Sequence, residues 1–556
     1  MPGDPGVDAG EDASSRTGAF RLGTFLSDSR PVLLLFTVIY LVPTVVMASR
    51  KLLWDDEFFT LYLSTTSGWS ELQRALATGA DQHPPLFYYL IHQIVALLGV
   101  SHISLRLPSI FGIWLFSVCI FFILRKLTTP AWAVVGLLSP LVTGAYWYAA
   151  EARGYALMMG FLSVALLAWL RAADGVRRKL FLVLIAIGFA FAVGSHYYAA
   201  LALMPIVAGE LVRTFIRRKI DWPIWLAFAS PLTTIAACLP ALQSARKYSS
   251  HFWAVPHLSD LFEYYPNALS FSINVIVLAV LLAVLLRIRA AGRMSGVAVC
   301  RPFQIWEKAA LTGFAILPLV IMIFARTVTH AFVERYAMPA LIGALILICY
   351  YVAGLARCGS TSAALTILVQ LLWFGVMVGG LLKRDSRLRE EFRGDLQALI
   401  KSGDHPTALA EITVFHALSF YGPRDTVKRF AYLADPASAI KFLGHDTVDR
   451  GFLDLRPWFP LNIVPFQVFV AENRSFLVYG YSGDWSWLTF QLMKPDFQSV
   501  FVGRIRNRML LYVERKEANP IAPAAGPVDR LYDRLRVTAP TLCEHYMGLG
   551  RCPSLE

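Results

Sequence analysis

The sequence predicts an α-helical polytopic membrane protein with a soluble C-terminal α/β domain. Apolar residue types make up 56% of the 556 residues and charged types only 16%, whereas soluble proteins carry about 25% charged residues. The apolar residues are also bunched: residues 31–382 contain repeated runs near or above the roughly 18 residues that a bilayer span needs, and such runs stop after Lys383. Intrinsic disorder and a purely soluble enzyme are therefore excluded.

We expect about eleven transmembrane helices. They lie near residues 32–48, 107–124, 131–148, 155–170, 180–195, 198–212, 223–242, 270–286, 309–325, 337–355 and 362–382. Residues 85–98 follow two prolines and are too short to cross. We expect them to form a helix that lies flat in the membrane interface.

Three regions follow from this pattern. Residues 1–30 are polar and read as a disordered cytoplasmic leader, residues 31–384 form the transmembrane domain, and residues 385–556 form the soluble domain. Four runs in the last region look like strands: Glu411–His416, Phe466–Ala471, Phe476–Tyr481 and Met509–Glu514. The aromatic residues Trp485, Trp487 and Phe490 either stack on sugar rings or belong to the core of this domain.

The distribution of basic residues sets the orientation. Residues 1–384 hold 30 Lys and Arg against 18 Asp and Glu, whereas residues 385–556 hold 21 against 20. With a cytoplasmic N-terminus, 19 of those 30 basic residues fall in cytoplasmic loops. We expect a multi-pass protein of the cytoplasmic (inner) membrane, with its C-terminal domain exocytoplasmic. A nucleic-acid partner is excluded, because the tail is nearly neutral.

The cysteines follow from the same topology. Cys300 and Cys358 fall in loops expected in the reducing cytoplasm. Cys543 and Cys552 lie in the exported tail, where an oxidising compartment allows a disulfide.

Two polar motifs stand near the first span. Asp55, Asp56 and Glu57 come directly after it. They either belong to an ordinary solvent-exposed loop, or one of them accepts a proton as a general base. His83 precedes two prolines, which place it at a bend. A lone histidine is more often a hydrogen-bonded structural residue than a metal ligand.

Two further motifs carry arginines. Glu151 and Arg153 lie between the third and fourth spans, as a loop-anchoring ion pair or as an acid and an anion-binding cation. Arg335 opens the tenth span, where it either anchors the interface or binds phosphate in a bidentate manner. All four motifs fall on one membrane face, and together they favour a site over unrelated loop ends.

In their order and spacing these motifs resemble the polytopic GT-C glycosyltransferases that use polyprenyl-phosphate sugar donors. This group includes protein O-mannosyltransferases, aminoarabinose transferases acting on lipid A and rhizobial core-oligosaccharide transferases. The resemblance covers roughly residues 30–385. The matching elements are Asp56-Glu57, the His-Pro-Pro-Leu-x-Tyr-Tyr stretch His83–Tyr89, the Glu-x-Arg-x-Tyr set Glu151, Arg153 and Tyr155, and Arg335-Tyr336 with Pro339.

The resemblance implies an inverting glycosyltransferase that moves a sugar from a polyprenyl-phosphate donor to a hydroxyl of a glycan, lipid or protein acceptor. The implied catalytic residues are Asp56 and Glu57, with Asp55 as the alternative base. The implied substrate-binding residues are Glu151, Arg153, Tyr155, His83, Arg335 and Tyr336. No cofactor is certain, and a divalent metal at His83 is an open alternative. The sequence has no Gly-rich phosphate loop, which fits a donor that is not a nucleotide sugar.

Two other classes remain as alternatives. A transporter or flippase of lipid-linked saccharides would show related halves and charges near mid-membrane, whereas here the acids cluster at span ends. A membrane-anchored binding protein would use the tail as its active part.

Overall fold

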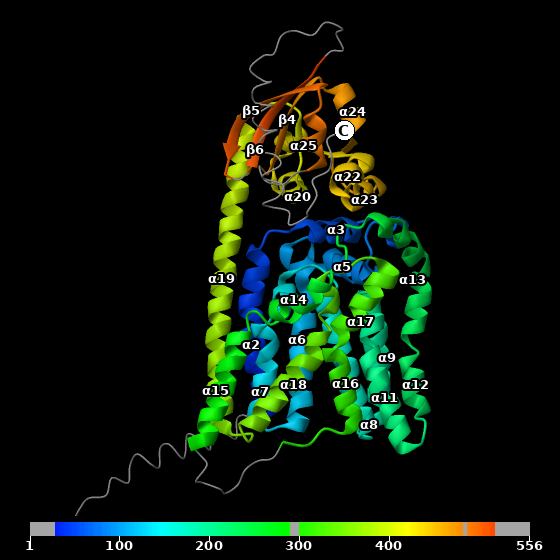
Figure 1. The fold of residues 1–556 in the computed structure, drawn as a ribbon, viewed down its shortest axis with the longest axis vertical. Helices are drawn as coiled ribbons and strands as arrows, with labels where there is room; N and C mark the ends of the chain where they lie inside the picture. Colours follow the sequence, from blue (N-terminus) through cyan, green and yellow to red (C-terminus); the bar gives the residue numbers. More distant parts are fainter. Residues whose placement is uncertain (1–27, 290–299, 482–485, 507, 517–556) are drawn as a thin grey trace, which may run out of the picture.

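The computed structural model describes residues 28–289, 300–481, 486–506 and 508–516. The predicted leader, apart from its last three residues, lies outside this part of the chain, as do Trp485 and the predicted Cys543–Cys552 disulfide. A bundle of long helices carries a smaller α/β domain at one end (Figure 1). We call this end of the bundle the domain end and the opposite end the far end.

In the part of the chain that the structure describes, seven segments of the bundle are helical, long and apolar enough to cross a membrane. They are α2 (Ser29–Arg50), α6 (His102–Leu127), α8 (Tyr155–Ala173), α9 (Arg178–Ser195), α10 with α11 (Ala199–Ala202 and Met204–Arg217), α12 with α13 and η3 (Trp222–Phe228, Pro231–Ala245 and Arg246–His251), and α19 (Ser360–Lys401).

Three bent pairs qualify as single spans among the described residues, which makes ten. They are α7 and η1 (Pro130–Leu138, Ser139–Val142) with η2 (Gly144–Ala150), α14 (Leu258–Ala268) with α15 (Ile273–Arg289), and α16 (Ile305–Ala315) with α17 and η4 (Leu317–Phe324, Ala325–Thr329). The remaining predicted span is α18 (Ala340–Leu355), preceded by η5 (Glu334–Ala337). Its 16 residues fall short of the length that defines the others. The polytopic helical fold is confirmed.

Three short helices cover the domain end of the bundle: α3 (Asp55–Ser64), α4 (Trp69–Ala77) and α5 (Pro85–Leu98). The predicted flat helix has the bounds of α5. Pro85 starts it, because proline is tolerated in the first turn. Gly99 ends it with a φ of 77°, a conformation that glycine adopts without strain.

The C-terminal domain contains a six-stranded sheet in the order β3-β2-β1-β4-β6-β5. Strands β1 (Thr407–Leu409), β2 (Phe430–Ala434) and β3 (Ile463–Pro465) pair in parallel, and β1 also pairs in parallel with β4 (Ser475–Tyr481). Strand β6 (Arg508–Arg515) is antiparallel to β4 and to β5 (Phe497–Ile505). The helices are α20 (Ile412–Tyr421), α21 (Arg424–Val427), α22 (Pro436–Leu443), α23 (Thr447–Leu455), α24 (Phe466–Glu472) and α25 (Trp487–Leu492).

Two of the four predicted strands are correct, as β4 and β6, and two are wrong. Residues 411–416 lie almost entirely in α20, and residues 466–471 lie in α24. In α24 the buried residues are Phe466, Phe469 and Val470, which is the spacing of one helix face. Short apolar runs are compatible with a strand or a helix, and tertiary packing selected the helix for both segments.

Helix α19 joins the two parts of the molecule. It spans 42 residues, and the domain boundary predicted at 384/385 lies inside it. Its C-terminal part is anchored to the sheet, because Asp395 pairs with Arg508 at 2.7 Å and accepts a hydrogen bond from the Tyr479 hydroxyl at 2.9 Å.

Cys300 and Cys358 form a disulfide at the far end of the bundle. The sequence placed both cysteines as thiols in the reducing cytoplasm. Disulfides persist in oxidising compartments, so this bond and the distribution of basic residues favour opposite orientations of the chain.

Candidate functional site

The acidic triplet forms the first turn of α3, with Trp54 as the N-cap. Acids are favoured at this position, because the N-terminus of a helix carries partial positive charge. Successive helix residues point about 100° apart. The carboxylates of Asp55, Asp56 and Glu57 therefore reach three different neighbourhoods.

Asp56 faces two arginines. Its Oδ2 lies 3.0 Å from Nη2 of Arg335 and 3.8 Å from Nε of Arg153. The Asp56 side chain is 25% exposed, whereas those of Arg335 and Arg153 are 16% and 6% exposed. Asp56 Oδ2 and both Nε atoms have no hydrogen-bond partner among the described residues. This carboxylate is thus charge-paired yet keeps hydrogen-bonding capacity.

Arg153 is held by Asp81 and His83. Its Nη1 donates to Oδ2 of Asp81 at 3.2 Å and to the backbone oxygen of Asp56 at 3.1 Å. Its Nη2 lies 3.0 Å from Nδ1 of His83. Burial alone would raise the pKa of Asp81, but the guanidinium of Arg153 holds that pKa far below its usual range. The result is a fixed cation beside Asp56.

His83 is buried and keeps one free nitrogen. Its Nδ1 is 2.9 Å from Oδ1 of Asp81, while Nε2 has no partner among the described residues. Burial, with help from Arg153, lowers the pKa of His83. A neutral ring with an open nitrogen is suited to a substrate hydrogen bond. Together Asp56, Asp81, His83, Arg153 and Arg335 form what we call the Asp56 cluster.

Aromatic rings line this cluster. The Arg335 guanidinium lies over the rings of Trp54 and Tyr155, 5.8 and 5.5 Å from their centroids. Tyr336 stacks on Tyr198 with centroids 4.5 Å apart. Cation–π contacts of this kind orient a guanidinium without neutralising it.

Glu57 points away from Asp56 into the bundle. It is fully buried and pairs in a bidentate manner with Arg106, with both oxygens 2.7 Å from the guanidinium nitrogens. Its Oε1 also accepts the amide of Ala152 at 2.7 Å. Although burial would raise the pKa of Glu57, Arg106 and Lys51 lower it. Glu57 is therefore enclosed by the bundle, and its contacts hold the first turn of α3 to α6 and to the backbone at Ala152.

Glu151 is likewise engaged beside the cluster. Its Oε1 lies 3.0 Å from Nζ of Lys51 and accepts a hydrogen bond from the Trp147 indole. The backbone amide of Arg153 donates to the Glu151 carbonyl at 2.9 Å. Glu151 therefore fixes the loop that presents Arg153.

Asp55 points to the C-terminal domain. Its Oδ2 accepts a hydrogen bond from the Thr413 hydroxyl at 2.7 Å, and its Oδ1 lies 3.4 Å from Nδ1 of His416. Of the two candidate bases, only Asp56 faces the arginines.

A divalent metal at His83 stays a prediction. The described residues contain no group of three or more His, Cys, Asp or Glu side chains that could hold a metal ion. The nearest polar neighbour of His83 besides Asp81 is the cation Arg153.

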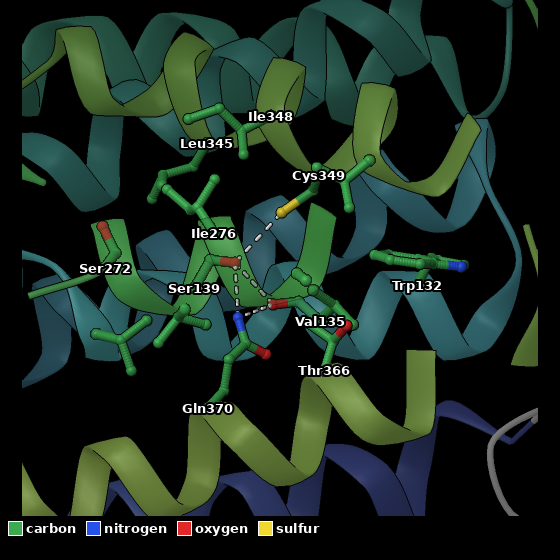
Figure 2. Close-up of a pocket in the computed structure, with 14 residues that line it drawn as sticks. Trp132, Val135, Ser139, Ser272, Ile276, Leu345, Ile348, Cys349, Thr366 and Gln370 are labelled. Atoms are coloured by element: carbon green, nitrogen blue, oxygen red, sulfur yellow. Dashed lines mark hydrogen bonds between the residues drawn. The ribbon is translucent and has the colours of Figure 1, made fainter. Parts of the chain in front are cut away.

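A small cavity inside the bundle is a packing feature. It lies among α7, η1, α15, α18 and α19 and holds about 30 Å³ (Figure 2). Figure 2 shows Ser139, Cys349 and Gln370 converging there, with Gln370 Nε2 3.2 Å from Ser139 Oγ. Apolar side chains supply most of the lining, and the Oε1 of Gln370 has no hydrogen-bond partner among the described residues.

Comparisons with known proteins agree with this architecture. Residues 82–242 match the family model described as dolichyl-phosphate-mannose-protein mannosyltransferase. The apo crystal structure of ArnT from Cupriavidus metallidurans superposes over 86% of this chain and 97% of its own, with a TM-score of 0.51 and 13% identity. The chain has an ArnT-like fold. The structure of the same protein bound to undecaprenyl phosphate covers 89% of this chain and 99% of its own, with a TM-score of 0.50 and 15% identity. A comparison of the sequence with curated proteins finds no match.

These findings confirm the resemblance to the GT-C glycosyltransferases. Within the ArnT-like fold, the matched segment 82–242 holds His83, Glu151, Arg153 and Tyr155. Sequence reasoning missed Arg106 and Lys51, and also the buried His196, whose ring lies 4.9 Å from that of His83. Arg106 left a signal, since an arginine inside an apolar helix demands a buried acid.

Proposed function

We propose that this protein is an inverting membrane glycosyltransferase that takes its sugar from a polyprenyl-phosphate donor. The observation that carries the proposal is the pairing of the partly exposed Asp56 with Arg335 at 3.0 Å, beside Arg153. A base and a phosphate-binding cation must meet at the reacting carbon, and this pair brings both to one place. The binding of undecaprenyl phosphate by the structurally similar ArnT supports such a donor.

The proposed reaction has one displacement step. The acceptor hydroxyl attacks the anomeric carbon while the carboxylate of Asp56 takes its proton. The bond between that carbon and the phosphate oxygen breaks, and polyprenyl phosphate leaves. Arg335 and Arg153 stabilise the charge that develops on the leaving oxygen. Tyr155 and Tyr336 frame Arg335, and His83 offers its free Nε2 to the sugar.

The ion pair also implies an order of events. Without donor, Arg335 neutralises Asp56. A donor phosphate competes for the same guanidinium, because arginine binds phosphate in a bidentate manner. Donor binding then loosens the hold of Arg335 on Asp56, and the carboxylate becomes the stronger base when the sugar is in place.

The acceptor would approach from the side of η4. A cavity of about 440 Å³ lies there, and Arg326 and His330 are among the residues that line it. Tyr198 connects this cavity to the Asp56 cluster. Its hydroxyl is hydrogen-bonded to the Thr329 hydroxyl at 2.9 Å and donates to the Ala331 carbonyl at 3.1 Å, while its ring stacks on Tyr336. A glycan, lipid or protein acceptor would fit so open a cavity.

The test uses the purified full chain in lipid nanodiscs with a panel of polyprenyl-phosphate sugars. Release of free polyprenyl phosphate on adding acceptor extracts, lost in Asp56→Asn, is the expected result. Movement of intact lipid-linked sugar across vesicles without any release would instead indicate a flippase.

We further propose that the domain end faces the exocytoplasmic side of the inner membrane, with a cytoplasmic N-terminus. Protease added to intact spheroplasts should then digest the C-terminal domain. Digestion only after lysis would reverse the orientation and would place the Cys300–Cys358 disulfide outside.

A further inference from the structure

The first turn of α3 is held from the C-terminal domain as well as from the bundle. Thr413 and His416, both on α20, contact Asp55 at 2.7 and 3.4 Å. Asp56 is the next residue in the chain, and Glu57 after it is fixed by Arg106. The proposed base thus stands between two anchored neighbours, one of which depends on another domain.

The packing around these polar contacts is tight. His416 is fully buried, with its ring stacked on Phe58 at 5.0 Å. The Tyr421 hydroxyl, at the end of α20, accepts the amide of Leu53 at 3.0 Å and lies 2.7 Å from Nε2 of His102. Helix α20 therefore contacts Leu53 before the acidic turn, Asp55 within it and Phe58 after it.

Other contacts between the domain and the bundle avoid this turn. The Trp458 indole donates to Glu71 on α4 at 2.9 Å. Asp454 accepts from Lys247 and from the Tyr248 hydroxyl at 2.8 and 2.6 Å. Docking of the domain therefore does not by itself require the contacts with Asp55.

We infer that the C-terminal domain is a positioning element of the active site: Thr413 and His416 on α20 hold Asp55 and thereby fix the helical turn that presents Asp56. The inference rests on the proposed function. It makes Asp55 a positioning residue and leaves the base role to Asp56. A misplacement of the base by about 1 Å is enough to slow a reaction about a hundredfold.

The test compares two variants of the full chain. Thr413→Val with His416→Phe keeps the volume and removes both polar contacts to Asp55. Trp458→Phe is the matched control, because it removes one hydrogen bond between the domains without touching α3. The double variant should lower kcat about tenfold with an unchanged KM for the donor, and the control should stay within twofold of the wild type.

A second measurement does not need turnover. The amides of Glu57 and Phe58 both donate to the Trp54 carbonyl, at 2.8 and 3.2 Å. Hydrogen exchange in a peptide covering residues 55–63 should become at least tenfold faster in the double variant and stay unchanged in Trp458→Phe. Equal exchange or equal kcat in the two variants would overturn the inference. If Asp56→Asn kept full activity while exchange responded as expected, the proposed mechanism would fail and the positioning by α20 would stand.

Discussion

The two ends of the bundle each hold a buried cluster of charged residues, and the clusters differ in how completely they are paired. At the far end, Arg213 bonds Glu210 at 2.7 Å and Asp221 at 3.1 Å, and the Trp169 indole donates to Glu210 at 2.8 Å. None of the side chains of Glu210, Arg213 and Asp221 has a buried polar atom without a partner among the described residues.

The Asp56 cluster contains the same types of charged residue but is not saturated. Asp56 Oδ2, His83 Nε2 and the Nε atoms of Arg153 and Arg335 are buried and without hydrogen-bond partners in the part of the chain that the structure describes. Unpartnered polar atoms in a buried site cost free energy. The Asp56 cluster therefore keeps hydrogen-bonding capacity for the donor proposed above, whereas the far-end cluster uses its capacity within the bundle.

The largest expected effect on turnover comes from Asp56→Asn. The amide keeps the shape but cannot take a proton, so turnover should fall by about 10²–10⁴. Release of polyprenyl phosphate by the purified variant checks this. Asp55→Asn made in parallel should lower turnover far less, by at most the roughly tenfold expected when the contacts between Asp55 and α20 are lost, and the reverse pattern would move the base to Asp55.

Arg335→Lys should have the next largest effect. Lysine keeps the charge but not the planar fork that binds phosphate with two hydrogen bonds. We expect kcat/KM for the donor to fall by about tenfold to a hundredfold, which corresponds to about 1.4–2.7 kcal/mol. Kinetics at varied donor concentration measure this, and an unchanged kcat/KM would remove Arg335 from phosphate binding.

Glu210→Gln tests the other side of the comparison. Loss of one charge from the saturated cluster should cost about 1–3 kcal/mol of stability, because a hydrogen bond to a charged partner is weakened. Turnover at low temperature should stay within twofold. Thermal unfolding in detergent measures the loss of stability, and the release assay measures turnover. A large loss of turnover in a folded variant would show that the far end takes part in function.

The smallest effect on turnover is expected for Asp449→Asn in the C-terminal domain. Burial raises the pKa of Asp449 from 3.8 to about 7, although its Oδ1 accepts the Asp435 amide and the Trp487 indole at 2.9 and 3.0 Å. The folded domain keeps a proton that the unfolded chain releases. Its stability should therefore fall as the pH rises from about 4 to 7, by at most about 4 kcal/mol.

The matched measurement is urea unfolding at pH 5 and pH 7.5. The asparagine variant should lose most of this slope, because an amide does not titrate. A variant that keeps the full pH dependence would assign it to another group.

The sequence predicted the bundle better than the C-terminal domain, and particular residues show why. Long apolar runs define spans by length alone, so every predicted span falls on a helix. Residues 411–416 and 466–471 are short runs that suit strand and helix equally, and the buried face of each helix became visible only in the fold. Two of the three aromatic residues that the sequence left open lie in the core of the domain: Trp487 is buried and donates to Asp449, and Phe490 stacks on Phe442.

The site shows a similar division. The motifs placed Asp56, Arg153 and Arg335 on one face, and the structure brings them together. The partners of Glu57 and Glu151 could not be read from the sequence, because Arg106 and Lys51 lie 49 and 100 residues away from them along the chain. Spacing in the sequence gives no measure of such pairings.

The unbroken helix α19 sets the distance between the bundle and the C-terminal domain. Its 42 residues give a length of about 63 Å, of which about 30 Å suffices to cross the hydrocarbon layer. The remaining length determines how far the sheet lies from the membrane surface and how it is rotated about the helix axis. One inserted residue in this part would lift the domain by about 1.5 Å and swing it by about 100°, and α20 would then no longer meet α3. The length of this helix therefore fixes where the C-terminal domain meets α3.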